Sequence, residues 1–310
     1  IQQNKMLNTQ QDTRKKLGFR ALQFILNPTV SAVKKNISLI QHIPNPSEEM
    51  QLAAVEKYGG AIKFIQNPTE AVQLAAVIRC STAIQYIPEN IQTRLVQLTA
   101  VEKDPWVIQY ISDPSEIVQF AALNYLINKN ITWLTILNNI KNPTEVVQLA
   151  AVNFNIREFK NITNPSEAVQ LAAVNKNSNA LLIIPNPSEA VQIAAINNNS
   201  DIFRDITNPT EIVQLAVVKK NPSLIEIIQN PTETVQLAAV KRSAKLIEFI
   251  QNPTETVQLA AVKRSARSIT LIRNPTETVQ LTAVIKDSSL IRHLQNPSEA
   301  VQLVVERSNR

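Results

Sequence analysis

Histidine and cysteine often carry catalysis or bind metals, but this chain of 310 residues has only two histidines and one cysteine. Two histidines could hold a metal ion or act as general acid and base, and a cysteine near a histidine could be a nucleophile. The sequence is built from repeats, described below, and His42 and His293 lie in repeats that are far apart along it. Cys80 has no histidine near it in the sequence. We therefore expect no catalytic or metal site at these three residues.

Glycine is also scarce, with Gly18, Gly59 and Gly60 against 17 prolines. Phosphate-binding loops and the left-handed turns of large β proteins use glycine repeatedly, because glycine adopts positive φ without strain. Most enzyme folds are therefore disfavoured, and no carboxylate pair stands out among the 25 acidic residues. We predict that the chain is not an enzyme and that it binds no cofactor or metal.

The elements that must position any functional residue follow a 22-residue repeat. Residues 230–251 read NPTETVQLAAVKRSAKLIEFIQ, and position 1 of the repeat is the first asparagine. A shortened copy begins at Asn27. Two copies are irregular, one starting at Ile91 without Asn-Pro and one of 29 residues from Asp113 to Lys141. The twelve full copies start at Asn45, Asn67, Ile91, Asp113, Asn142, Asn164, Asn186, Asn208, Asn230, Asn252, Asn274 and Asn296.

Each repeat predicts two helices. Asn at position 1 is a strong N-cap, Pro at position 2 suits the first helical turn, and Glu at position 4 can reach back to the cap amide. The first helix then extends through VQLAAV to about position 13, where Lys or Arg suits the negative helix end. Isoleucines at positions 18 and 21, such as Ile225 and Ile228, predict one apolar stripe on a second helix.

Two short helices cannot bury an apolar face alone, so successive repeats must stack. The predicted fold is all-α, an α-solenoid of twelve to thirteen two-helix repeats on the order of 100 Å long at a helix spacing of about 8–10 Å. Ala-Ala at positions 9 and 10 would let neighbouring helices approach closely. We expect a basic arm with a partial capping unit at 1–26 and the repeat array at 27–310, with irregular units at 91–141.

The repeat unit, with its Asn-Pro start and VQLAAV core, resembles HEAT-like and leucine-rich-variant-like α-helical repeats. It is most similar to the VQLAAV-type arrays of large bacteriophages, giant viruses and some bacteria, which mostly have no assigned function. The resemblance covers residues 27–310 and implies an architecture. Together with the many Asn, Ile and Lys residues, it points to a viral or phage protein, either a structural component of the virion or a host-interaction factor.

Position 7 is glutamine in every full copy, and the helical periodicity turns it inward. In the structural interpretation the amides form a ladder, each bonding to its neighbour or to a carbonyl of the turn. In the functional interpretation they line a concave groove that grips an extended ligand. The residues of this glutamine row are Gln51, Gln73, Gln97, Gln119, Gln148, Gln170, Gln192, Gln214, Gln236, Gln258, Gln280 and Gln302.

The irregular units hold both tryptophans, Trp106 and Trp133, together with Tyr110 and Tyr125. Aromatic side chains on irregular loops are typical interface anchors, so we expect these four residues to contact a partner. The alternative is that they fill packing gaps that the insertions open.

The positive charge is concentrated towards the ends of the chain, where residues 208–295 hold 11 basic and 7 acidic residues. Stacking would align cations from equivalent positions into a basic edge that could follow phosphates. The alternative is that cations near helix C-termini only complement the helix dipole. The basic edge consists of Lys219, Lys220, Lys241, Arg242, Lys245, Lys263, Arg264 and Arg267.

The combined interpretation is a scaffold that binds a protein partner through its extended surface, in a large assembly or alone. A nucleic-acid-binding repeat protein is the alternative. No stretch of 18 uncharged apolar residues could span a bilayer, no secretion signal is recognisable, and one cysteine gives no disulfide framework. We therefore expect an intracellular protein, in the cytoplasm or the virion, without a membrane partner.

Overall fold

The computed structural model describes residues 29–308, and this part of the chain contains thirteen α-helices and no β-strand. Packing divides the chain between Asn164 and Pro165 into two compact bodies, here the N-terminal body (29–164) and the C-terminal body (165–308). The predicted arm and capping unit at 1–26 lie outside the described residues.

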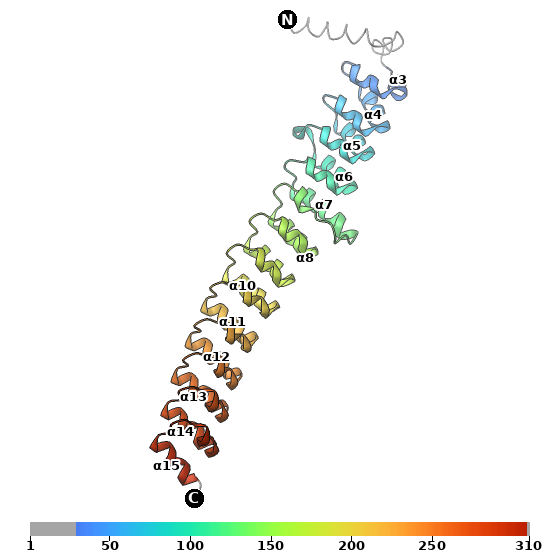
Figure 1. Ribbon diagram of the computed structural model, residues 1–310. Helices are drawn as coiled ribbons and strands as arrows, with labels where there is room; N and C mark the ends of the chain where they lie inside the picture. The colour runs from blue at the N-terminus through green and yellow to red at the C-terminus, as the bar shows by residue number, and fades with distance from the viewer. Residues whose placement is uncertain (1–28, 309–310) are drawn as a thin grey trace, which may run out of the picture. The chain divides into compact units, whose positions relative to one another are not determined.

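The N-terminal body alternates α-helices with 3₁₀ helices (Figure 1). Its α-helices are α3 (Val30–Lys35), α4 (Glu48–Lys57), α5 (Glu70–Arg79), α6 (Arg94–Lys103), α7 (Glu116–Asn128) and α8 (Glu145–Phe154). Its 3₁₀ helices are η1 (Ile37–His42), η2 (Gly59–Phe64), η3 (Ser81–Tyr86), η4 (Glu89–Ile91), η5 (Pro105–Tyr110), η6 (Leu137–Asn139) and η7 (Ile156–Asn161).

The C-terminal body repeats the same alternation without insertions. Its α-helices are α9 (Glu167–Lys176), α10 (Glu189–Asn198), α11 (Glu211–Lys220), α12 (Glu233–Arg242), α13 (Glu255–Arg264), α14 (Glu277–Lys286) and α15 (Glu299–Ser308). Its 3₁₀ helices are η8 (Ser178–Ile183), η9 (Ser200–Asp205), η10 (Pro222–Ile227), η11 (Ala244–Phe249), η12 (Ala266–Leu271) and η13 (Ser288–His293).

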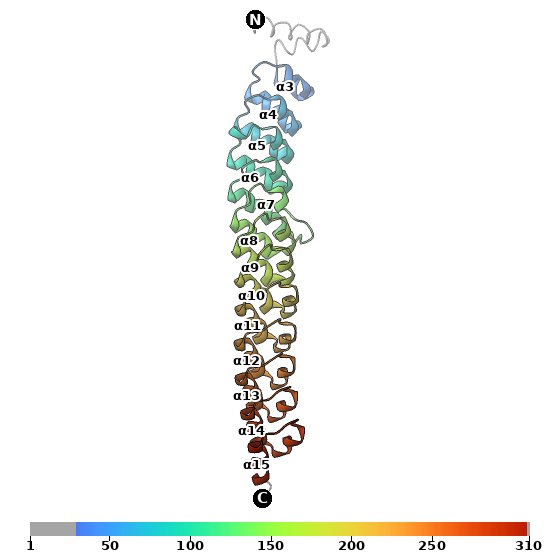
Figure 2. The same ribbon diagram turned by 60° about the vertical axis from the view of Figure 1, so that its left-hand side comes forward.

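Within each body the α-helices lie side by side in chain order, and most pack on the 3₁₀ helix of their own repeat, whereas α7 packs on η5 and α15 on η13 of the preceding repeats (Figures 1 and 2). Successive 3₁₀ helices also contact one another and form a second layer. The predicted all-α tandem-repeat fold, an α-solenoid, is confirmed.

The start of the α-helix differs from the prediction. The N-cap is Ser or Thr at position 3, and the helix begins at the Glu of position 4. Thr210, for example, accepts a hydrogen bond from the amide of Val213. The asparagine of position 1 instead adopts the left-handed conformation, with φ between 48° and 53° in seven repeats. Asparagine tolerates this region better than other non-glycine residues, so the turn needs no glycine.

The second helix is a 3₁₀ helix of six residues in every regular repeat. The sequence predicts a helix at this place but not its 3₁₀ type. It must run back along an α-helix of ten residues, which is about 15 Å long at 1.5 Å per residue. Six residues span about 12 Å as a 3₁₀ helix but only about 9 Å as an α-helix. Side chains at i and i+3 eclipse in a 3₁₀ helix, which places both Ile225 and Ile228 in the core.

The core of each repeat contains positions 6, 10 and 11 of the α-helix and positions 17, 18 and 21 of the return segment. In the repeat 208–229, Val213, Val217 and Val218 are fully buried, and Leu224 and Ile225 are buried beneath them. The residues at positions 6, 10 and 11 of this α-helix are small or β-branched, which lets adjacent α-helices approach closely.

Glutamate at position 4 links neighbouring repeats at no fewer than five places, whereas the sequence predicts a bond to the cap amide of its own helix. Thr232 Oγ1 donates to Glu211 Oε1 at 2.7 Å, and Thr276 Oγ1 donates to Glu255 Oε1 at 2.8 Å. The hydroxyls of Thr278 and Thr276 hold the pKa of the Glu255 carboxyl below its ordinary value. The cap of one helix and the first turn of the preceding helix therefore stabilise each other.

Candidate partner-binding surfaces

The two histidines and the cysteine lie in or beside three different elements. His42 is half-buried in η1, and the exposed His293 in η13 accepts a hydrogen bond from Arg292 Nε at 3.3 Å. Cys80 ends α5, and a Cβ atom on Gly59 would lie 2.8 Å from the Cβ of Cys80, so the glycine permits this close approach. In the described part of the chain no group of three or more His, Cys, Asp or Glu side chains could hold a metal ion.

The glutamine row bonds mainly within each repeat. In these bonds the glutamine Nε2 donates to the proline carbonyl of position 2, as Gln214 does to Pro209 at 3.0 Å and Gln236 to Pro231 at 2.8 Å. This bond is present in eleven of the twelve copies, and the exception is Gln97, whose repeat lacks the proline. Of the two partners predicted for the amide, the structure therefore records the turn carbonyl.

Among the described residues, Gln119 is the one glutamine of the row that bonds to the next repeat. Its Oε1 accepts from the amide of Thr144 at 3.0 Å, and its Nε2 donates to Pro114 and more weakly to Asn142. In seven other copies Oε1 is buried without a hydrogen-bond partner among the described residues: Gln51, Gln73, Gln192, Gln214, Gln236, Gln258 and Gln280. Only three of the row are fully buried, namely Gln73, Gln119 and Gln258.

The insertion of the repeat 113–141 lengthens α7 to 13 residues and adds a loop that protrudes from the stack (Figure 2). The next repeat anchors this loop. Glu158 replaces the leucine found at position 17 in several repeats, and its carboxylate accepts from the amides of Ile136 at 2.6 Å and Leu137 at 3.2 Å. Asn155 Nδ2 donates to the carbonyl of Leu134 at 3.0 Å.

Glu158 is only 1% exposed. Burial raises the pKa of its carboxyl above the ordinary value of 4.5, and the hydrogen bonds from Ile136, Leu137 and Asn161 partly oppose this shift. Sequence reasoning missed this residue, although a charged side chain at a position that is apolar in neighbouring repeats was a visible signal.

The four predicted aromatic contacts have different environments. Trp133, in the anchored loop, is 67% exposed and therefore does not fill a packing gap. Tyr110 on η5 is 38% exposed, whereas Trp106 on η5 and Tyr125 on α7 are half-buried.

The structure adds a row of aromatic side chains to Tyr110. Phe64 on η2 and Tyr86 on η3 occupy the same position 20 in the two preceding repeats and are also exposed. These three 3₁₀ helices pack in succession within the N-terminal body, so the rings follow one another along its surface. The shared position in the 22-residue frame was the signal that could have revealed this row.

The basic edge comprises two groups of exposed cations in the C-terminal body. Six lie at the C-terminal ends of α11, α12 and α13, and Lys245 and Arg267 lie on η11 and η12. In other repeats, lysines at position 13 bond to the C-terminal end of the preceding α-helix. Lys57 Nζ donates to the carbonyl of Lys34 at 2.6 Å, and Lys286 Nζ donates to that of Lys263, as the helix-dipole interpretation requires.

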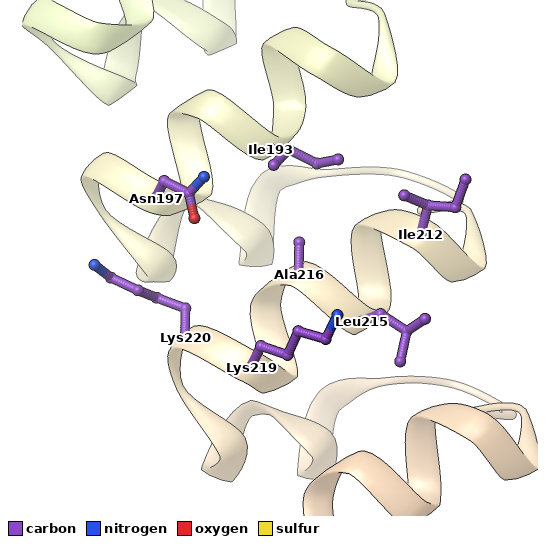
Figure 3. Close-up of a pocket in the computed structure, with 7 residues that line it drawn as sticks. All are labelled: Ile193, Asn197, Ile212, Leu215, Ala216, Lys219 and Lys220. Carbon is purple, nitrogen blue, oxygen red and sulfur yellow. The ribbon is translucent and has the colours of Figure 1, made fainter.

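A shallow depression of about 460 Å³ separates α10 from α11 beside these cations (Figure 3). Ile193 and Asn197 line it from α10. From α11 it is lined by Ile212, Leu215, Ala216, Lys219 and Lys220. The wall formed by α11 is therefore mostly apolar, and Lys219 and Lys220 place two positive charges at its end.

Comparisons with protein-family models, curated proteins and solved structures found no match to this chain. Within the described residues, no helix combines the length and the apolarity needed to cross a membrane.

Proposed function

We propose that this chain is a non-enzymatic α-solenoid scaffold that binds a protein partner through its extended surface. The observation that carries the proposal is the loop between α7 and η6, whose backbone is hydrogen-bonded to the next repeat while Trp133 is 67% exposed. Tryptophan is among the residues that most often anchor protein interfaces. A loop that is already ordered loses little entropy on binding, which favours affinity.

Two further features support a protein partner. The exposed row of Phe64, Tyr86 and Tyr110 offers aromatic contacts along the N-terminal body. The resemblance of the repeats to arrays of large phages and giant viruses supports a place in a large assembly, in the virion or the host cytoplasm.

The test is affinity capture from native extract followed by mass spectrometry, with Trp133→Ala as the variant. Leu182→Ala is the matched control, because Leu182 is an apolar side chain of 57% exposure on the C-terminal body. We expect Trp133→Ala to lose at least one captured protein at unchanged helical circular dichroism, and Leu182→Ala to retain it. Identical captured proteins for both variants and the parent chain would contradict the proposal.

Nucleic-acid binding by the basic edge is the second candidate, favoured by the exposure of all eight of its cations. Binding through phosphates weakens steeply as salt rises. Gel retardation with single- and double-stranded oligonucleotides over a salt series tests it, and no retardation at low salt removes it.

A further inference from the structure

The cations of α11–α13 border apolar side chains on the outer side of the same helices, and together they form a surface that we call the basic groove. We propose that the basic groove binds an extended segment of a partner protein that carries a carboxylate on every third residue. This inference rests on the proposed function and specifies the chemistry of the partner. The basic groove consists of positions 5, 8, 9, 12 and 13 of α11, α12 and α13, together with Ile193 and Asn197 of α10.

The helix geometry places the apolar strip on the side opposite the core. At 100° per residue, positions 5, 8, 9 and 12 point away from the buried positions 6, 10 and 11. On α11 this leaves Ile212 56% exposed and Leu215 and Ala216 half-buried, whereas Val217 is fully buried. The leucine and alanine recur at the same positions of α12 and α13, so the strip continues along the body.

The depression between α10 and α11 shows how the strip accommodates a side chain. Figure 3 shows Ile193 of one helix facing Ala216 of the next, with Lys220 extended from the end of α11 towards α10. Because the side chain of Ala216 is small, a space remains above it, and Ile193 and Leu215 line this space. An apolar side chain of a ligand would contact carbon atoms there on both helices.

The charges give the groove a polarity. Each of α11, α12 and α13 ends in two exposed cations and begins with an exposed glutamate at position 4. The two rows are about 12 Å apart, since eight residues of α-helix separate positions 4 and 12 at 1.5 Å each. An acidic segment is therefore attracted to the C-terminal ends of the helices and repelled from their N-terminal ends.

The repeat spacing sets the ligand's period. Packed α-helices lie about 8–10 Å apart, so one pair of cations recurs at about that interval. A chain in the extended polyproline II conformation has three residues per turn and advances about 3.1 Å per residue, so three residues cover about 9 Å, or one repeat, and every third side chain points the same way. A carboxylate on every third residue meets successive cation pairs, while the residues between them reach the apolar strip.

The same features favour a polypeptide over a nucleic acid. Phosphates contact cations but gain nothing from half-exposed leucine and alanine, whereas a polypeptide has apolar side chains to place there. The row of glutamates at the N-terminal ends also opposes a polyanion that covers the whole face.

Fluorescence anisotropy with the full chain and three labelled probes tests the proposal. The probes are a peptide of five Glu-Leu-Ser units, a peptide of the same composition with its glutamates consecutive, and a single-stranded oligonucleotide of equal charge. The groove variant is Lys219→Glu/Lys241→Glu/Lys263→Glu. The matched control, Arg204→Glu/Arg273→Glu/Arg292→Glu, changes the net charge equally at exposed residues outside the α-helices and outside the basic edge.

We expect the periodic peptide to bind about tenfold more tightly than the clustered one, and the groove variant to lose about tenfold in affinity for it, because several surface charge contacts act together. The control variant should retain most of the affinity. Equal binding of the two peptides, equal losses in both variants, or tighter binding of the oligonucleotide would each overturn the proposal. If the peptides fail but Trp133-dependent capture succeeds, the scaffold function stands and only this assignment is wrong.

Discussion

Replacing Glu158 by leucine would restore the residue that several other repeats carry at position 17. On repeat similarity alone the change should stabilise the protein, but the structure predicts the opposite. The carboxylate accepts hydrogen bonds from the amides of Ile136 and Leu137. These two residues are 0% and 2% exposed. Leucine would leave both amides buried without a partner.

The magnitude follows from two opposing terms. Each orphaned buried amide costs about 1–3 kcal/mol, so the pair costs about 4 kcal/mol at central values. Burying a leucine side chain contributes about 2 kcal/mol in the other direction. We therefore expect Glu158→Leu to lower the free energy of unfolding by about 2 kcal/mol, as the difference of these terms. Chemical denaturation followed by circular dichroism measures it, and hydrogen exchange should show the amides of Ile136 and Leu137 losing protection.

The pH dependence gives this prediction a second readout. Burial raises the pKa of Glu158, so the folded protein holds this proton more tightly than the unfolded chain does. The resulting stability is fully present below the ordinary carboxyl pKa of 4.5 and is lost as pH rises through the raised folded pKa. The difference in the free energy of unfolding between the parent chain and Glu158→Leu should therefore become smaller as pH rises from the ordinary pKa of 4.5 through the raised folded pKa. A variant at least as stable as the parent chain at every pH, with unchanged exchange, would refute this reasoning.

Three further substitutions test the repeat itself by denaturation. Ala239→Leu should destabilise by about 1–3 kcal/mol through overpacking, because Ala239 is fully buried, and an unchanged midpoint would show that the helices can separate. Gln214→Leu should cost about 1 kcal/mol through the lost bond to Pro209 while partner capture persists; lost capture at full stability would favour the ligand-gripping interpretation. Asn208→Ala should cost about 1 kcal/mol at its φ of 50° and Asn208→Gly much less, and equal effects would contradict the left-handed turn.

The repeat frame was predictable because local rules and burial point the same way at most positions. Alternation of buried and exposed residues with a period near 3.6 marks the VQLAAV helix, and Pro and Asn mark its start. The cap was assigned two residues too early because Asn, Ser and Thr are all good caps, and only backbone geometry shows that the asparagine is left-handed. The 3₁₀ return depends on the distance that six residues must cover, which no propensity contains.

The sequence by itself determined that this is a tandem array of helical repeats, with charges and aromatic residues at known positions of a 22-residue frame. Tertiary structure alone decided which of these side chains contact each other and which remain exposed. Several glutamates of position 4 bond to the next repeat, the glutamines bond mostly to their own turn, and Glu158 bonds to the insertion that exposes Trp133. The physical reason is that hydrogen-bond partners and burial depend on distances between stacked repeats, and residue types within one repeat do not specify those distances.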